Sequence, residues 1–221
     1  MKWSIPNTLT ILRLLAAPGV AVMFLYFQRP WADWFALTLF VSAAITDYFD
    51  GYLARLWKQE SKFGAMLDPI ADKAMVVIAI MVLTGYSGMN PWLILPATVI
   101  LFREVFVSGL REFLGAKAGL LKVTKLAKWK TTAQMVAIAV LFLGTGLEYL
   151  NGVAMHGMTP EQYAEAVTQG LADPIRACGK RDCASLAGDV GLVLMWIAAF
   201  LTALTGLDYF NKSLPFLRDE K

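Results

Sequence analysis

Histidine and cysteine are almost absent from this sequence, which has one histidine and two cysteines among 221 residues. Charged residues are also few, at 17% of the chain against 57% hydrophobic residues, and neither an internal repeat nor a low-complexity tract is present. The net charge of only +3 gives no reason to expect a nucleic-acid partner. Apolar residues instead fall in runs of about twenty, the length at which a helix crosses a bilayer core. The sequence therefore predicts an integral membrane protein.

We expect an all-α integral membrane fold, a single domain over residues 1–221 with six transmembrane helices. The first apolar run is not a cleavable signal peptide, because it contains Arg13 and Pro18 and lacks a small-residue cleavage site before Arg29. The predicted spans are Leu9–Phe27, Trp34–Leu53, Ala65–Tyr86, Trp92–Phe113, Thr131–Leu150 and Gly188–Asp208.

Lysine and arginine gather in alternate loops, which predicts the orientation. The loops on the opposite side are nearly free of them, with Arg29 alone in the first. We therefore expect both termini in the cytosol and the protein in the cytoplasmic (inner) membrane. Besides Lys2 at the N-terminus, the basic residues of the inner segments are Arg55, Lys58, Lys62, Lys117, Lys122, Lys125, Lys128, Lys130, Lys212, Arg218 and Lys221.

One long polar connection, an insertion at about residues 151–187, falls on the outer side in this topology. It contains both cysteines, Cys178 and Cys183, where oxidation is allowed. A local disulfide is our preferred interpretation, with a pair of free thiols as the alternative. A metal site is not expected there, because only His156 is nearby.

Four aspartates lie at the cytosolic ends of the second and third predicted helices. Asp47 and Asp50 are three residues apart and Asp68 and Asp72 are four apart, so each pair projects from one helix face. Four adjacent carboxylates cannot all stay ionised without a cation, and hard oxygen ligands favour Mg²⁺, Mn²⁺ or Ca²⁺ over Zn²⁺. The alternative is that each aspartate pairs with a nearby basic residue at a helix end, which explains one aspartate better than four.

Small residues accompany the aspartates. Gly51 and Ala54 share the helical face of Asp47, and Gly64 lies one turn before Asp68. They leave a smooth trough in which a ligand could approach the backbone. Close packing of membrane helices is the alternative explanation, and both can hold.

These residues resemble the CDP-alcohol phosphotransferase family. The signature D-x2-D-G-x2-A-R-x8-G-x3-D-x3-D is matched at every fixed position, and an accidental match has a probability of about 10⁻¹⁰ per site. The resemblance also implies six membrane helices with the signature on the second and third. The matching residues are Asp47, Asp50, Gly51, Ala54, Arg55, Gly64, Asp68 and Asp72.

The resemblance implies roles for these positions. Asp47, Asp50 and Asp68 would hold two divalent ions, Mg²⁺ or alternatively Mn²⁺, and Asp72 would complete the second ion site and act as general base. The stretch "IPNTLTILR" resembles the family's entry to the first helix, although Asn7 and Thr8 could also be ordinary helix caps. The residues implied to contact CDP-diacylglycerol are Pro6, Asn7, Thr8, Leu9, Thr10, Gly51, Ala54, Arg55, Ser61 and Gly64.

Basic residues in the fourth and fifth spans suggest the acceptor. Arg103, Arg111, Lys128 and Lys130 would suit a phosphorylated, anionic alcohol. A positive loop that touches anionic headgroups is the alternative, but it explains the two arginines poorly because they lie within an apolar helix.

Together "IPNTLTILR", "SGLREF" and "KWKTTAQ" resemble the phosphatidylglycerophosphate synthase branch of the family. This implies transfer of the phosphatidyl group from CDP-diacylglycerol to sn-glycerol 3-phosphate, giving phosphatidylglycerol phosphate and CMP. Inositol phosphate or another alcohol is the alternative acceptor, and a cation transporter or a structural scaffold is a more distant alternative. Small-residue helix faces are compatible with a homodimer, and the family is commonly dimeric.

Overall fold

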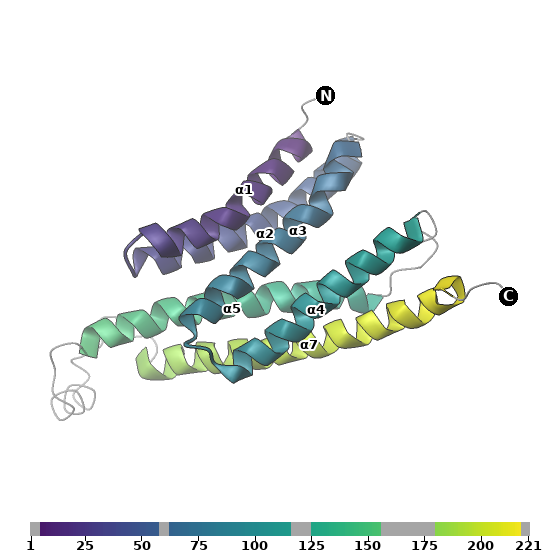
Figure 1. The fold of residues 1–221 in the computed structure, drawn as a ribbon. Coiled ribbons are helices and arrows are strands. Elements are labelled where there is room, and N and C mark those ends of the chain that lie inside the picture. The colour runs from purple at the N-terminus through teal and green to yellow at the C-terminus, as the bar shows by residue number, and fades with distance from the viewer. Residues whose placement is uncertain (1–4, 58–61, 116–124, 156–179, 218–221) are drawn as a thin grey trace. The chain divides into compact units, whose positions relative to one another are not determined.

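The computed structural model describes residues 5–57, 62–115, 125–155 and 180–217 (Figure 1). Side chains are described within these segments except at residues 5–6, 48–57, 62, 125–128, 151–155 and 180–184. The described segments are helices with short turns between them and contain no strand. The all-α prediction is confirmed for this part of the chain.

The six helices of the described segments overlap the six predicted spans, and each helix is longer than its span. In particular, α5 continues to Met155 and α7 begins at Lys180, so both enter the region that we predicted as an outer insertion. An apolar run marks only the part of a helix that matches the bilayer core, and the helix itself can continue beyond it. The helices are α1 (Ile5–Tyr26), α2 (Trp31–Trp57), α3 (Lys62–Tyr86), α4 (Pro91–Leu114), α5 (Lys125–Met155) and α7 (Lys180–Leu217).

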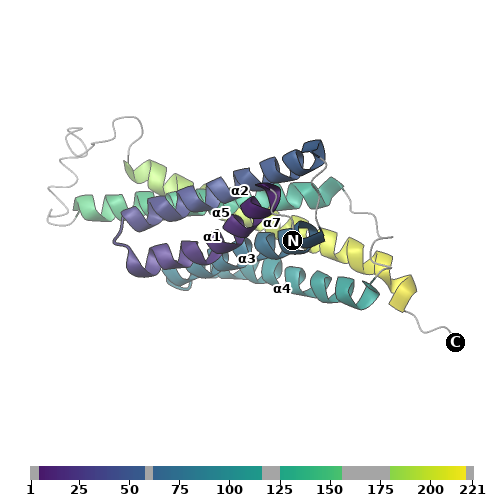
Figure 2. The same ribbon diagram turned by 90° about the horizontal axis from the view of Figure 1, so that it is seen from above.

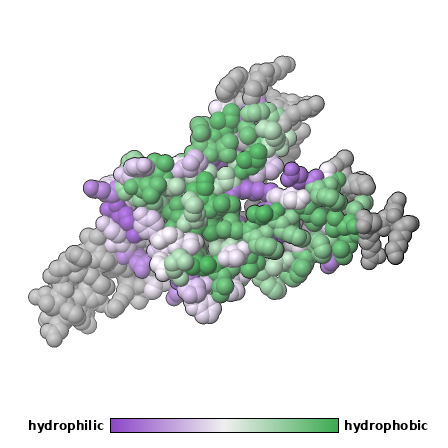
Figure 3. All heavy atoms as spheres, viewed as in Figure 1, coloured by the Kyte–Doolittle hydropathy of each residue, from purple (hydrophilic) through white to green (hydrophobic). Residues whose placement is uncertain are grey.

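Four segments of the described chain are long and apolar enough to cross a membrane: Asn7–Tyr26, Pro91–Leu114, Trp129–Leu150 and Ser185–Leu217. At most 39% of any such segment's apolar window is buried within the chain. Apolar residues cover much of the face shown in Figure 3. Such a surface is unfavourable in water and favourable against lipid tails, so the chain is a multi-pass membrane protein.

The chain divides into two compact units, which we describe separately. The first comprises Met1–Leu83 and Ala139–Gly191, and the second comprises Thr84–Ile138 and Leu192–Lys221. In the first unit α1 and α2 lie side by side and antiparallel (Figures 1 and 2). The ring of Phe142 packs against Phe24 and Phe40, with centroids 5.8 Å away in both cases. These rings join α5 to the α1–α2 pair.

Glycines allow α5 and α7 to approach closely within the first unit. A Cβ atom at Gly191 would lie 2.7 Å from Leu141 Cδ2, and one at Gly144 would lie 3.3 Å from the backbone nitrogen of Gly188. Small residues at helix contacts are typical of membrane helices, which gain stability from close packing rather than from exclusion of water.

In the second unit α4 and α7 run parallel. Near the start of α4, the indole of Trp196 donates a hydrogen bond to the carbonyl of Trp92 at 3.0 Å. Further along, the rings of Phe106 and Phe210 pack with their centroids 5.7 Å apart. The side chain of Asn90 caps α4 by accepting a hydrogen bond from the backbone nitrogen of Trp92.

A partly buried ion pair fixes the turn between α1 and α2. The guanidinium of Arg29 donates to both carboxylate oxygens of Asp33, at 2.8 and 2.6 Å, and to the carbonyl of Thr145 at 2.8 Å. The Asp33 side chain is fully buried, and Arg29 also lies over the ring of Tyr149. Arg29 therefore links this turn to α5 through charge-assisted hydrogen bonds.

The substitution Asp33→Ala should destabilise the protein by about 3 kcal/mol, because it leaves Arg29 without its counter-charge in a mostly buried place. Thermal unfolding in detergent measures this loss. Asp208→Ala is the matched control, since Asp208 pairs with Lys212 in an exposed position and should cost less than about 1 kcal/mol. Equal effects of the two substitutions would contradict the assignment of Asp33 as a buried structural group.

Candidate active site

The aspartates predicted as a cluster come from two helices. Asp47 lies in α2, and Asp68 and Asp72 lie one turn apart in α3. All three side chains are partly exposed. Asp50 also lies in α2, but its side chain is outside the described part of the structure. The described aspartates are brought together by residues of α1.

Arg13 of α1 joins the two acidic helices. One of its terminal nitrogens donates to Asp47 and also to Asp72, the latter at 2.9 Å, and its side chain is only 2% exposed. Because one nitrogen contacts both carboxylates, Asp47 and Asp72 must lie close to each other. The positive charge of Arg13 offsets the repulsion between them.

Thr10, one helical turn before Arg13, contacts the third aspartate. Its hydroxyl donates a hydrogen bond to Asp68 at 2.8 Å, and its side chain is buried. Asn7 lies one further turn back and is also buried. The face of α1 formed by these three residues is thus turned toward the acidic part of the first unit.

Arg13 is a residue of this cluster to which we assigned no role from the sequence. The sequence does indicate that Arg13 is important, because an arginine inside an apolar run is energetically costly in a membrane and usually has a partner or a function there. The spacing of three between Thr10 and Arg13 also places both on one face of the helix.

The acidic residues fit a hard divalent cation by the chemistry of their oxygen donors. Asp47 and Asp72 are already within reach of one cationic nitrogen, and Asp68 lies one turn from Asp72. Among residues with described side chains, no three acidic, histidine or cysteine groups converge as a complete ligand set. The predicted set includes Asp50, whose side chain is not among them.

The structure describes only some of the other predicted positions. Ser61 and Cys178 lie outside the described residues, and the side chain of Cys183 is not described. Gly64 is buried at the start of α3, Thr8 is exposed and Leu9 is partly exposed. The remaining positions lie in helices at points where no side chain is described: Pro6, Gly51, Ala54, Arg55 and Lys128.

The basic residues predicted for the acceptor lie in the second unit. Arg103 of α4 and the buried Lys130 of α5 both contact one carboxylate oxygen of Glu104, Arg103 at 3.2 Å. The trio thus gathers two cationic side chains around one carboxylate. Arg111 is not part of it; its guanidinium lies 5.3 Å from the centre of the Tyr209 ring.

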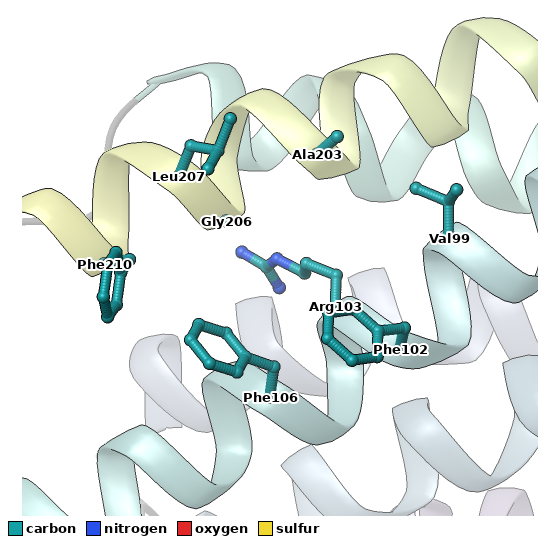
Figure 4. A pocket seen from close by; sticks show the side chains of 8 residues that line it. All are labelled: Val99, Phe102, Arg103, Phe106, Ala203, Gly206, Leu207 and Phe210. Carbon is teal, nitrogen blue, oxygen red and sulfur yellow. The ribbon is translucent and has the colours of Figure 1, made fainter.

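A groove of about 400 Å³ lies between α4 and α7 (Figure 4). Arg103 extends from α4 toward α7 beside Gly206, where a Cβ atom would lie 2.9 Å from Arg103 Cγ. Apart from Arg103 and Gly206, the lining side chains are apolar, so the groove suits hydrocarbon better than a polar acceptor. These apolar residues are Val99, Phe102, Phe106, Ala203, Leu207 and Phe210.

Comparison with known proteins agrees with the resemblance seen in the sequence. Residues 3–204 match the family model described as CDP-alcohol phosphatidyltransferase. A protein of Cereibacter sphaeroides named "CDP-diacylglycerol--glycerol-3-phosphate 3-phosphatidyltransferase" is 80% identical over 221 residues, which cover 100% of both chains.

Two more distant relatives have the same name. The protein of Rickettsia bellii is 38% identical over 94% of each chain. That of Escherichia coli K12 is 42% identical over 143 residues, which are 64% of this chain and 78% of the relative. The family match extends over most of the described helices, including those that carry the aspartates, and on this evidence the chain belongs to the CDP-alcohol phosphatidyltransferase family.

Proposed function

We propose that this chain is a CDP-diacylglycerol--glycerol-3-phosphate 3-phosphatidyltransferase. It transfers the phosphatidyl group of CDP-diacylglycerol to the 1-hydroxyl of sn-glycerol 3-phosphate and releases CMP. The observation that carries this proposal is the 80% identity, along the whole chain, with a relative of that name. The acidic cluster around Arg13 supplies the chemistry that such a reaction needs.

The acidic residues Asp47, Asp50, Asp68 and Asp72 would hold two divalent ions, with Mg²⁺ as the ion in cells and Mn²⁺ as an alternative. Bound there, a divalent ion neutralises charge on the diphosphate and on the departing CMP. Their hard carboxylate oxygens and the proximity of Asp47 to Asp72 support this assignment.

Asp72 acts as the general base. Its carboxylate takes the proton from the 1-hydroxyl of the acceptor as that oxygen forms a bond to the β-phosphorus of the donor. The bond from this phosphorus to the oxygen of CMP breaks, and CMP leaves with the electron pair. Arg13 is a positioning residue, because its hydrogen bond holds the Asp72 carboxylate in one orientation.

The donor's CDP part lies against the start of α1 and the signature residues of α2 and α3. Buried Asn7 and Gly64 support a close approach there. The full set of proposed contacts is Pro6, Asn7, Thr8, Leu9, Thr10, Gly51, Ala54, Arg55, Ser61 and Gly64.

The acceptor's phosphate is bound by the basic residues of α4 and α5, namely Arg103, Arg111, Lys128 and Lys130. The Arg103–Glu104–Lys130 group supports this assignment, because it brings two cationic side chains into a mostly buried place where an anion interacts with them strongly.

The protein crosses the cytoplasmic membrane six times. Both termini and the acidic helix ends lie in the cytosol. The sidedness of lysine and arginine in the loops supports this orientation. The donor's acyl chains can then stay in the bilayer while its diphosphate reaches the acidic cluster. We also propose a homodimer, which the exposed apolar faces of the helices would allow.

With detergent-purified protein, CDP-diacylglycerol and Mg²⁺, CMP should be released with glycerol 3-phosphate and not with inositol phosphate, serine or phosphatidylglycerol. The basic residues assigned to the acceptor site favour a phosphorylated acceptor over serine, and the relatives' name specifies glycerol 3-phosphate. CMP release with a different acceptor would disprove the proposed substrate and retain the family reaction.

Asp72→Asn should lower the rate of CMP release by about 10³-fold, because an amide cannot accept the proton. Asp189→Asn is the control, since Asp189 is an exposed aspartate of α7 and should keep the wild-type rate. A comparable rate in the Asp72→Asn protein, with its fold shown intact by circular dichroism, would mean that another group is the base.

Arg13→Gln should lower kcat by about 100-fold, because the carboxylates of Asp47 and Asp72 lose the group that orients them. Arg13→Lys should recover part of this loss, since it restores a positive charge. The Tm in detergent should fall in the glutamine variant and recover partly in the lysine variant. Lys212→Gln, which removes an exposed charge, is the control for both measurements; a kcat for Arg13→Gln as high as that of this control would refute the positioning role.

A further inference from the structure

A line of polar residues runs along the buried face of α7. Thr202, Thr205, Tyr209 and Ser213 are all buried, and their spacings of three and four place them on one helix face. Two of them are satisfied within the helix: Thr205 donates to the carbonyl of Thr202 at 3.0 Å, and Ser213 donates to that of Phe210 at 2.7 Å. These two need no ligand.

The hydroxyls of Thr202 and Tyr209 differ from these two in their hydrogen bonding. Within the described residues, the hydroxyls of Thr202 and Tyr209 have no hydrogen-bond partner, although the two residues are 0% and 7% exposed. A buried hydroxyl without a partner loses its hydrogen bonds to water and gains none in return. An apolar side chain of the same shape would be more stable at either position.

A third buried polar atom, from α4, approaches the same face of α7. The Nε atom of Arg103 also lacks a partner among the described residues, and it would lie 3.7 Å from a Cβ atom at Gly206. Gly206 is four residues after Thr202 and three before Tyr209, on the same side of α7. Gly206 therefore brings Arg103 of α4 to the face of α7 that carries Thr202 and Tyr209, and Figure 4 shows Arg103 extending from α4 toward Gly206.

A polar ligand fits this line better than a lipid chain does. The apolar groove between α4 and α7 opens on the neighbouring face of α7, through Ala203, Leu207 and Phe210. The guanidinium of Arg111 lies over the ring of Tyr209, which brings a second positive charge to the polar line. Hydroxyls beside two arginines are suited to a small anionic polyol.

We propose that Tyr209 and Thr202 are specificity-determining residues of the acceptor site, where their hydroxyls form hydrogen bonds with the polar groups of a phosphorylated polyol. This inference rests on the proposed function and adds two residues of α7 to the four basic residues assigned there. A site that binds a substrate through buried hydroxyls rejects alcohols that cannot satisfy them.

Tyr209→Phe removes only the hydroxyl and keeps the ring beneath Arg111. We expect the KM for glycerol 3-phosphate to rise by about tenfold, the effect of losing one hydrogen bond to a ligand. The KM for CDP-diacylglycerol should change by less than about twofold, and the Tm without acceptor should stay equal or rise. Thr202→Val, which has the same shape as threonine, should show the same pattern.

Thr205→Val and Ser213→Ala are the matched controls, because these hydroxyls already have partners in the helix. Neither should alter the KM for the acceptor. An unchanged acceptor KM in both Tyr209→Phe and Thr202→Val, equal increases for both substrates, or a fall in Tm would overturn the inference, since each would assign the hydroxyls a structural role.

The same measurements separate this inference from the proposed function. If the wild-type protein releases CMP only with another alcohol, the proposed acceptor is wrong. The KM for that alcohol then tests Tyr209 and Thr202 in the same way, and a tenfold rise still supports their role.

Discussion

One buried guanidinium determines how the polar end of the first unit is arranged. Arg13 of α1 contacts Asp47 of α2 and Asp72 of α3 through a single nitrogen, so three helices meet at one charged group. Two carboxylates brought this close repel each other, and a buried arginine alone would be equally costly. The arginine and the two carboxylates therefore compensate one another's charge. Arg13 can be buried only when the three helices associate.

A second contact makes this arrangement directional. Thr10 binds Asp68 while Arg13, three residues later, binds Asp72, four residues after Asp68. Two contacts in the same order along both helices fix the rotation of α1 and its register on α3. The carboxylates that we assign to the reaction are consequently held in place before any substrate arrives, and a preorganised site spends less of the binding energy on orientation.

The sequence predicted the helices well, because apolar runs are a local property, and it placed Asp47, Asp68 and Asp72 in the helices where they lie. It did not predict the partners of Arg13, which lie 34 and 59 residues away. An arginine in an apolar run requires a partner but does not specify it, since the choice depends on how neighbouring helices rotate. Glu104 shows the same limit, because its contact with Lys130 of another helix follows from packing. Thr10, assigned to the donor by resemblance, also binds Asp68.

The polar line of α7 was hidden for a different reason. Hydroxyls that donate hydrogen bonds to carbonyls of their own helix, such as those of Thr205 and Ser213, cost little in an apolar helix. The sequence of this segment therefore indicates only a membrane span. Arg103 lies at the boundary of two environments: its aliphatic stem packs at Gly206 beside the apolar groove, while its guanidinium contacts Glu104. A reaction between a membrane lipid and a water-soluble phosphate needs such a boundary, since the lipid chains require hydrocarbon and the acceptor requires hydrogen bonds. On our assignment of the acceptor site, α4 and α7 offer both on adjacent faces of the same helices.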